Sequence, residues 1–408
     1  QALATVAEQT GAAFLVESSL RRETASIRVV ARLIEAKGQT QLWCGTFDGE
    51  RGESVLALQR DLSRAVAAQV HSQISAGPTD ALALRQPSNA AAYDLYLRGR
   101  YLWHQLSADS TRRAMEHFQR ATGLDGDYAL AWAGMAVCFA AAPITGDASS
   151  LQVLAPARNA AAQAAKADPR LAETHTAAGF VKFWLDWDYI RAEESFRRAV
   201  QLDPSDAAAH RTLAVLLAYQ HRHREARASC RLACSLDPLN GANFALAAQV
   251  EYFARNWPEA VEFAKRAIEV DSGLWVGHLQ LAQAKERLGD YDGALEALAQ
   301  PAPIAANNSK VAALRGYIQG VTGRTDAARE TLRQLAELRL QRFVPPYAEA
   351  SIWLGLGDLQ QAANSIERCI EVHDVHLNFL LADAKWDVMR GQPGFGEILS
   401  RCGFILST

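Results

Sequence analysis

A short phrase built around an aspartate recurs along this chain at a nearly fixed interval, and it limits the possible folds more than any other feature. The phrase reads GLDGD at 123–127, KADPR at 166–170, QLDPS at 201–205, SLDPL at 235–239 and EVDSG at 269–273. Successive aspartates are 43, 35, 34 and 34 residues apart. A period of 34 residues predicts repeats of two antiparallel helices, each of which needs its neighbours to bury its apolar face.

Small residues recur with the same period and strengthen this prediction. A glycine ends the first helix of three repeats, where a left-handed backbone is needed, at Gly289, Gly323 and Gly357. The small residues at which two helices can approach closely are Ala114, Ala157, Ala192, Ala226, Ala260, Ala294, Ala328 and Ala362. This pattern is typical of tetratricopeptide repeats, and we count eight helix pairs. The predicted fold class is mainly α, a tetratricopeptide-type solenoid preceded by a small α+β domain.

Two insertions interrupt the period. Nine extra residues fall near 142–150, where we expect a loop between the helices of the second repeat. A smaller insertion lies near 106–108 in the first repeat. Insertions in solenoids map to edges and often to binding faces, although neutral drift would give the same pattern.

The two ends of the chain do not follow the repeat. Residues 1–76 contain β-branched runs at 14–17, 27–34 and 41–47, followed by an amphipathic pattern over 54–74, which predicts an antiparallel meander and one covering helix. This domain looks incomplete, because the chain begins with Gln1 in a helix-like pattern. We assign 77–90 to a linker, 91–374 to the solenoid and 375–408 to a helical cap in which Trp386 and Phe395 are the apolar plugs.

Composition bears on the environment and on the partners. The formal charge of −3 and the pI near 6.4 provide no large positive field for nucleic acid. We see no run of about 18 apolar residues and no positively charged leader, so neither a membrane span nor export is expected. Six cysteines without a C-x-x-C pair are interpreted as small core residues in a reducing compartment. Cytoplasm is the expected location.

Several segments resemble a known family of bacterial signalling proteins. VESSLRR at 16–22, RVVARLI at 28–34, Leu42-Trp43 and LALQ at 56–59 are similar to the TolB-N-like domain that precedes tetratricopeptide arrays. Serine stands at position 18 where that family usually has glycine. The array entry at 92–101 and the tail, with KWD at 385–387 and residues 395–403, are also typical of it.

The resemblance covers nearly the whole chain and implies its architecture. It does not identify the activity of the protein to which the region belongs. Such regions are found behind OmpR-type winged-helix DNA-binding domains, class III adenylate cyclases and some serine/threonine kinases. The winged-helix setting is the commonest of these. It implies that DNA is contacted by a domain before Gln1 and that this part senses or recruits.

The sequence lacks the common catalytic motifs. The sequence has no phosphate-binding loop, no H-E-x-x-H and no G-x-S-x-G. His175, His210 and His278 share one repeat position, but stacked repeats hold equivalent atoms roughly 10 Å apart, too far for one metal ion. We therefore expect no enzyme activity, no cofactor and no metal site.

The concave face of the array is the predicted binding surface. First helices line it, and aromatic residues recur near their ends, at Trp184, Tyr219 and Phe253. Such a strip suits an extended peptide or an amphipathic helix. Packing between helices is an equally good interpretation. The full set of predicted partner-binding residues is Phe180, Phe183, Trp184, Arg211, Tyr219, Gln249, Tyr252, Phe253 and Arg287.

These observations favour the non-catalytic, protein- or ligand-binding half of a cytoplasmic bacterial signalling protein, with a winged-helix regulator as the first choice. The regulatory region of a cyclase or kinase and a free-standing scaffold are the alternatives. A small-molecule effector is an additional candidate partner. A homodimer stays open, because Trp132, Trp257, Trp275 and Trp353 could mark a shared surface instead.

Overall fold

The structure is a computed structural model of the whole chain. It describes residues 6–7, 11–22, 26–50, 58, 61–63, 65–66, 69–70, 89–300, 308–392 and 394–402. Residues 1–94 and 95–408 form two compact units.

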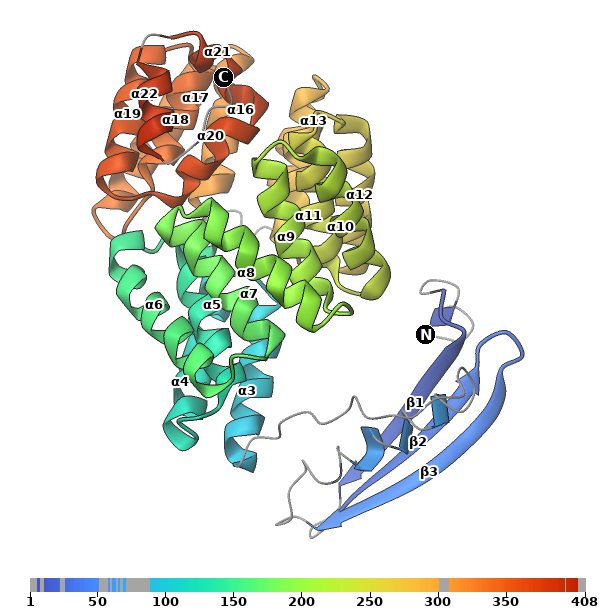
Figure 1. Cartoon of the computed structure of the whole chain (residues 1–408). Coiled ribbons are helices and arrows are strands. Elements are labelled where there is room, and N and C mark those ends of the chain that lie inside the picture. The colour runs from blue at the N-terminus through green and yellow to red at the C-terminus, as the bar shows by residue number, and fades with distance from the viewer. Residues whose placement is uncertain are drawn as a thin grey trace. The chain divides into compact units, whose positions relative to one another are not determined.

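The first unit contains a three-stranded antiparallel sheet in the order β1-β2-β3 (Figure 1). Alternate residues of the central strand, Val29, Ala31 and Leu33, are buried on one face. Arg28 and Asp48 form an exposed ion pair between neighbouring strands, so the apolar and polar faces alternate as expected for a half-covered sheet. The predicted meander is confirmed, with strands β1 Phe14–Arg22, β2 Ser26–Glu35 and β3 Thr40–Glu50.

Other predictions for this region fall largely outside the described residues. The helix expected over 54–74 is described at only a few positions, and the linker expected at 77–90 is described only at its last two residues. Both stay predictions.

The second unit is an α-solenoid with the eight predicted helix pairs (Figure 1). The pairs are α3 Ala90–Trp103 with α4 Ala108–Leu124, α5 Ala129–Gly146 with α6 Ser150–Ala167, α7 Ala172–Phe180 with α8 Tyr189–Leu202, α9 Ala207–Tyr219 with α10 His223–Leu236, α11 Gly241–Phe253 with α12 Trp257–Val270, α13 Trp275–Arg287 with α14 Tyr291–Leu298, α16 Ser309–Val321 with α17 Thr325–Arg339, and α18 Pro346–Gly355 with α19 Leu359–Glu371. A π-helical turn, Val181–Asp186, continues α7.

Close packing explains the recurring small residues. The alanines that begin each second helix's apolar face, such as Ala192 and Ala226, are completely buried. Phe196 fills the space above Gly179, where a Cβ would lie 2.4 Å from the phenyl ring. The three repeat-turn glycines have φ of 76° to 81°, which confirms their predicted left-handed conformation.

The insertion at 142–150 is not the loop that we predicted. Helix α5 continues to Gly146, and only Asp147 to Ser149 separate it from α6. The alanine-rich run favours helix, and Pro143 is accommodated inside it. The inserted residues therefore lengthen a helix, which carries Asp147 toward the other end of the solenoid.

Helix α5 also corrects the expectation about apolar runs. Its 18 residues have a mean hydropathy of 1.6, so among the described helices it is long and apolar enough to cross a membrane. Within the solenoid 56% of this stretch is buried, as is usual for a core helix.

The C-terminal residues fold back along the inner side of the solenoid. They comprise short helical turns at Val375–Asn378, α20 Phe379–Ala382, Ala384–Trp386, α21 Asp387–Arg390 and α22 Phe395–Arg401. Trp386 and Phe395 are buried, which confirms them as apolar plugs. Residues 373–390, called the return segment below, contact inner helices as well as the last repeat.

Candidate binding site inside the solenoid

The predicted aromatic strip is present and continuous. Trp184 and Tyr219 have ring centroids 6.0 Å apart, and those of Tyr219 and Phe253 are 4.9 Å apart. Phe183 joins the strip, since its ring centroid lies 4.5 Å from that of Trp184. The repeat period therefore brings these aromatic side chains together, as the sequence predicted.

The strip does not face an open groove. Phe379 of the return segment lies across it, with ring centroids 6.4, 5.6 and 6.3 Å from Trp184, Tyr219 and Phe253. All three strip residues are less than a tenth exposed. The chain's own return segment thus occupies the surface that we predicted for a partner.

Polar contacts hold the return segment in place. Tyr252 donates a hydrogen bond to Asp383 at 2.7 Å, and Lys385 pairs with the same carboxylate at 2.8 Å. Although burial acts to raise the pKa of Asp383, Lys385 and Tyr252 keep it below its usual value. His373 donates from Nε2 to the carbonyl oxygen of Leu185 at 2.6 Å.

Arg287, another predicted binding residue, is likewise engaged in contacts within the chain. It pairs with Glu286 and donates to the hydroxyl of Tyr317 at 2.8 Å. Tyr219, Tyr252, Phe253 and Arg287 therefore do not line free space in the structure.

The remaining predicted residues line a cavity of about 180 Å³. Phe180, Phe183, Trp184, Arg211 and Gln249 all contribute to its wall. Arg211 is held by a hydrogen bond from Nη1 to Asn243 at 2.8 Å, and burial lowers the pKa of its guanidinium. Five of the binding residues predicted from the sequence therefore form part of the cavity wall.

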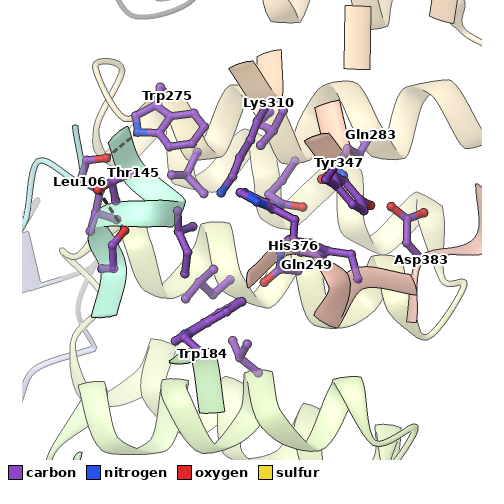
Figure 2. Close-up of a pocket in the computed structure, with 18 of the residues that line it drawn as sticks. Leu106, Thr145, Trp184, Gln249, Trp275, Gln283, Lys310, Tyr347, His376 and Asp383 are labelled. Carbon is purple, nitrogen blue, oxygen red and sulfur yellow. Dashed lines mark hydrogen bonds between the residues drawn. The ribbon is translucent and has the colours of Figure 1, made fainter. Parts of the chain in front are cut away.

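Both ends of the solenoid form the cavity wall. Leu106 and Thr145 come from the first two repeats, whereas Tyr347 and His376 come from the last repeat and the return segment (Figure 2). The indole nitrogen of Trp275 donates to the carbonyl oxygen of Leu106 at 2.7 Å. The solenoid therefore closes around the cavity.

Contacts such as this one, which join the first repeats to later ones, form a seam. A second contact of the seam involves the lengthened α5. Ser309 donates to Asp147 at 2.5 Å, and Arg342 pairs with the same carboxylate at 3.3 Å. Both sequence insertions, near Leu106 and at Asp147, thus contribute residues that join the first repeats to later ones.

Lys310 extends into the cavity (Figure 2), which Arg211 and Lys385 also line. It lies in the first turn of α16, where the helix dipole disfavours positive charge, and its ammonium lies 5.8 Å from the Trp275 ring centroid. Burial lowers the pKa of Lys310 to about 7, while Asp147 and Asp374 act to raise it. Within the described residues, no carboxylate lies at ion-pair distance from this ammonium.

Besides Asp383, whose Oδ2 is ion-paired with Lys385, three buried polar side chains of the described cavity wall have an atom without a hydrogen-bond partner. They are Oε1 of Gln280, Oγ of Ser351 and Nε2 of His376. Each residue is at most 2% exposed. Buried polar groups are normally hydrogen-bonded, so these three atoms are left unsatisfied by the chain alone.

The sequence did not identify this polar side. Trp275, Gln280, Lys310, Ser351 and His376 occupy unrelated positions in their repeats, so no periodic pattern links them. The signals that the sequence did contain were the insertions, which mark the seam. What brings the five residues together is closure of the solenoid.

Metal chemistry finds no support in the described part of the chain, where no group of three or more His, Cys, Asp or Glu could hold an ion. His175, His210 and His278 instead hydrogen-bond carbonyl oxygens six residues earlier, at 2.8, 3.0 and 3.2 Å. This confirms their interpretation as packing histidines. The cysteines are free, and all except Cys44 are buried.

Comparison with known proteins supports the fold and leaves the function open. No family model matches the chain. A protein of Rhizobium meliloti (strain 1021) named "Putative adenylate cyclase 3" is 28% identical over 133 residues, which is 32% of this chain. The match spans only about a fifth, 22%, of that protein.

Solved structures with a similar fold include several tetratricopeptide proteins. The APC/C assembly Cut9-Hcn1 matches 76% of this chain and 55% of its own, with 14% identity and a TM-score of 0.50. The type IV pilus biogenesis factor PilW matches 55% of this chain and 98% of its own, with 18% identity and a TM-score of 0.40. A thermophilic tetratricopeptide protein of Thermus thermophilus matches 48% and 98%, with 16% identity and a TM-score of 0.39. The helical unit is a tetratricopeptide-like solenoid.

Proposed function

We propose that this chain is the non-catalytic regulatory region of a cytoplasmic bacterial signalling protein, and that its effector binds inside the solenoid. The observation that carries the proposal is the position of the cavity between the two ends of the repeat array. A ligand there contacts the first repeats, the last repeat and the return segment at once. It therefore stabilises the closed arrangement relative to any opened one and can transmit a signal.

The aromatic strip has a part in this proposal. Phe379 covers the strip while the return segment is in place, so a protein partner that uses Trp184, Tyr219 and Phe253 must displace that segment. Effector binding in the cavity and partner binding on the strip then oppose each other, because His376 and Phe379 belong to the same segment. Such opposition is a coupling free energy between two sites.

Two outputs are candidates for the complete protein. The TolB-N-like resemblance favours a winged-helix transcription regulator, while the match to a protein named as an adenylate cyclase favours a cyclase. Reading the coding sequence before Gln1 separates them. A basic winged-helix domain supports the first, a cyclase core supports the second, and a start codon immediately before Gln1 supports a free-standing scaffold and contradicts the proposal.

The regulatory role is tested in the natural full-length protein with Trp275→Phe. This change removes the hydrogen bond to Leu106 across the seam and keeps an aromatic ring. We expect the output, DNA binding or cyclic nucleotide formation, to change several-fold, because one seam hydrogen bond contributes about 1 kcal/mol. Trp132→Phe is the matched control, since Trp132 donates a similar bond at 2.8 Å to Gly126 within its own repeat. Equal outputs from the two variants would contradict the proposal.

A further inference from the structure

We propose that the cavity binds a small monocarboxylate with an aromatic or similarly apolar body of about ten non-hydrogen atoms, its carboxylate held by Lys310. The inference rests on the proposed function in one respect, that the interior of the solenoid receives the effector. It adds the chemical class of that effector and the residues that select it.

The charge of the ligand follows from the ammonium of Lys310. The two acidic groups that act on it electrostatically, Asp147 and Asp374, are already engaged. Asp147 is paired with Arg342, and Asp374 accepts from Nδ1 of His376 at 2.6 Å. A half-buried ammonium at the wall of a largely apolar cavity is unfavourable without an anion, and one bound carboxylate supplies the missing charge.

The cations of the cavity wall also indicate how many negative charges the ligand carries. Two more cations line the cavity: Lys385 is paired with Asp383, and Arg211 donates from Nη1 to the neutral amide of Asn243. Lys310 is thus the ammonium of the described wall without a carboxylate partner, and a dianionic phosphate would need Arg211 as a second cation. A monocarboxylate matches the site.

The unpartnered polar atoms provide the rest of the recognition. The hydroxyl of Ser351 can donate to a carboxylate oxygen, and a Gln280 side chain turned by half a rotation offers its amide N–H in place of Oε1. Nε2 of His376, whose ring is fixed through Nδ1 and Asp374, accepts from a ligand N–H or O–H when the ring is neutral.

The apolar body follows from the apolar part of the wall and from the volume. Trp184, Phe180 and Leu279 line the cavity, and flat aromatic surfaces favour stacking with a ring. At about 15 Å³ for each water-sized group, 180 Å³ holds on the order of ten such groups.

The test is isothermal titration of the purified chain with three matched probes: phenylacetate, its neutral analogue phenylacetamide, and phenyl phosphate. Phenylacetate has ten non-hydrogen atoms, about the size proposed, and should bind one to one with a Kd of about 10 µM to 1 mM. Phenylacetamide and phenyl phosphate should each bind at least about tenfold more weakly. Equal binding of the amide and the carboxylate overturns the proposal, as does no phenylacetate binding up to about 10 mM.

Substitution of Lys310 locates the site. Lys310→Met should weaken phenylacetate binding at least about tenfold and abolish the preference over phenylacetamide. Lys265→Met is the matched control, because Lys265 is an exposed lysine on α12 that pairs with Glu262. Ser351→Ala should weaken binding several-fold with an unchanged melting temperature. Unchanged phenylacetate affinity in Lys310→Met would overturn the proposal.

The stability of Lys310→Met separates a binding role from a structural one. Loss of an uncompensated buried charge should leave the melting temperature of the free chain equal or higher. A lower melting temperature together with normal phenylacetate affinity would make Lys310 a structural residue and reject the site. Because these measurements use this chain alone, their failure leaves the regulatory proposal intact, which depends on the full-length output.

Discussion

First and second helices of the central repeats differ sharply in how much of their surface is buried. α9 and α11 each bury ten of their 13 residues, whereas α10 buries four of 14 and α12 three of 14. In an open solenoid, the first helices would expose one face to the concave side. Here the return segment and the closing seam cover that face, so the inner helices resemble the core of a globular domain.

The inner and outer helices therefore depend on different kinds of contact. The outer helices carry exposed ion pairs and tolerate change, since their apolar stripe packs only on neighbouring repeats. The inner helices depend on residues more than a hundred positions away, such as Phe379 against Tyr219. Substitutions on the two surfaces should therefore have very different effects.

The largest expected effect comes from the plug of the return segment. Trp386 is completely buried and donates to the hydroxyl of Tyr347 at 2.9 Å. Trp386→Ala should lower the free energy of unfolding by about 3–5 kcal/mol, measured by urea denaturation. The outer-surface control is Leu232→Ala on α10, where the side chain is 41% exposed and a change within about 0.5 kcal/mol is expected. Similar losses at both sites would refute the distinction.

A smaller effect is expected from Phe379→Ala, which uncovers the aromatic strip. Because Phe379 is half-buried, the free energy of unfolding should fall by about 2–3 kcal/mol. The emission of Trp184 should also shift to longer wavelength as water reaches the strip. Leu340→Ala, at an 88% exposed position, is the control. An unchanged spectrum in Phe379→Ala would mean that another group covers the strip.

The third effect concerns the pH dependence of stability. Lys310 has its pKa lowered to about 7 in the folded chain by burial, from 10.5. Between about pH 7 and pH 10, the unfolded chain therefore binds more protons at this group, and stability should rise with pH. Lys310→Met should flatten this rise and increase stability at pH 7 by about 1–2 kcal/mol. Parallel profiles for the variant and wild type would show that Lys310 titrates normally.

The smallest effect is expected on the outer surface. Arg112 on α4 pairs with Asp109 and Glu116 at 2.6 Å each, and all three side chains are more than half exposed. Arg112→Gln should cost less than about 0.5 kcal/mol, because solvent and salt screen exposed pairs. Thermal unfolding at low and high salt measures it. A loss above about 2 kcal/mol would mean that the outer surface is as sensitive to substitution as the inner one.

Sequence and structure agree where the determinants are local. The alanines and turn glycines specify each helix pair within one period, so the eight pairs and the strip of Trp184, Tyr219 and Phe253 could be predicted. The alternating apolar residues of 27–34 likewise specify a strand of the meander. In each case, the neighbours that matter lie within about one repeat.

Agreement ends where the fold depends on the accumulated rotation between repeats. Whether Trp275 meets Leu106, or Ser309 meets Asp147, depends on small rotations that add over several repeats, and no local pattern encodes their sum. The polar side of the cavity, with Lys310 and His376, is created by that sum. The loop predicted at 142–150 was wrong for a different reason, because the alanine-rich insertion extends α5 to Gly146 and the helix accommodates Pro143.

The seam also affects how the chain folds. Its contacts join residues far apart in the chain, 162 positions for Ser309 with Asp147 and 169 for Trp275 with Leu106, and closing such long loops is slow compared with forming a helix pair. During synthesis from the N-terminus, the helix pairs form first, and the strip stays uncovered until residues 373–390 leave the ribosome. Closure is then the last and slowest step, and until it occurs the nascent chain exposes its most aromatic surface to chaperones and to other chains.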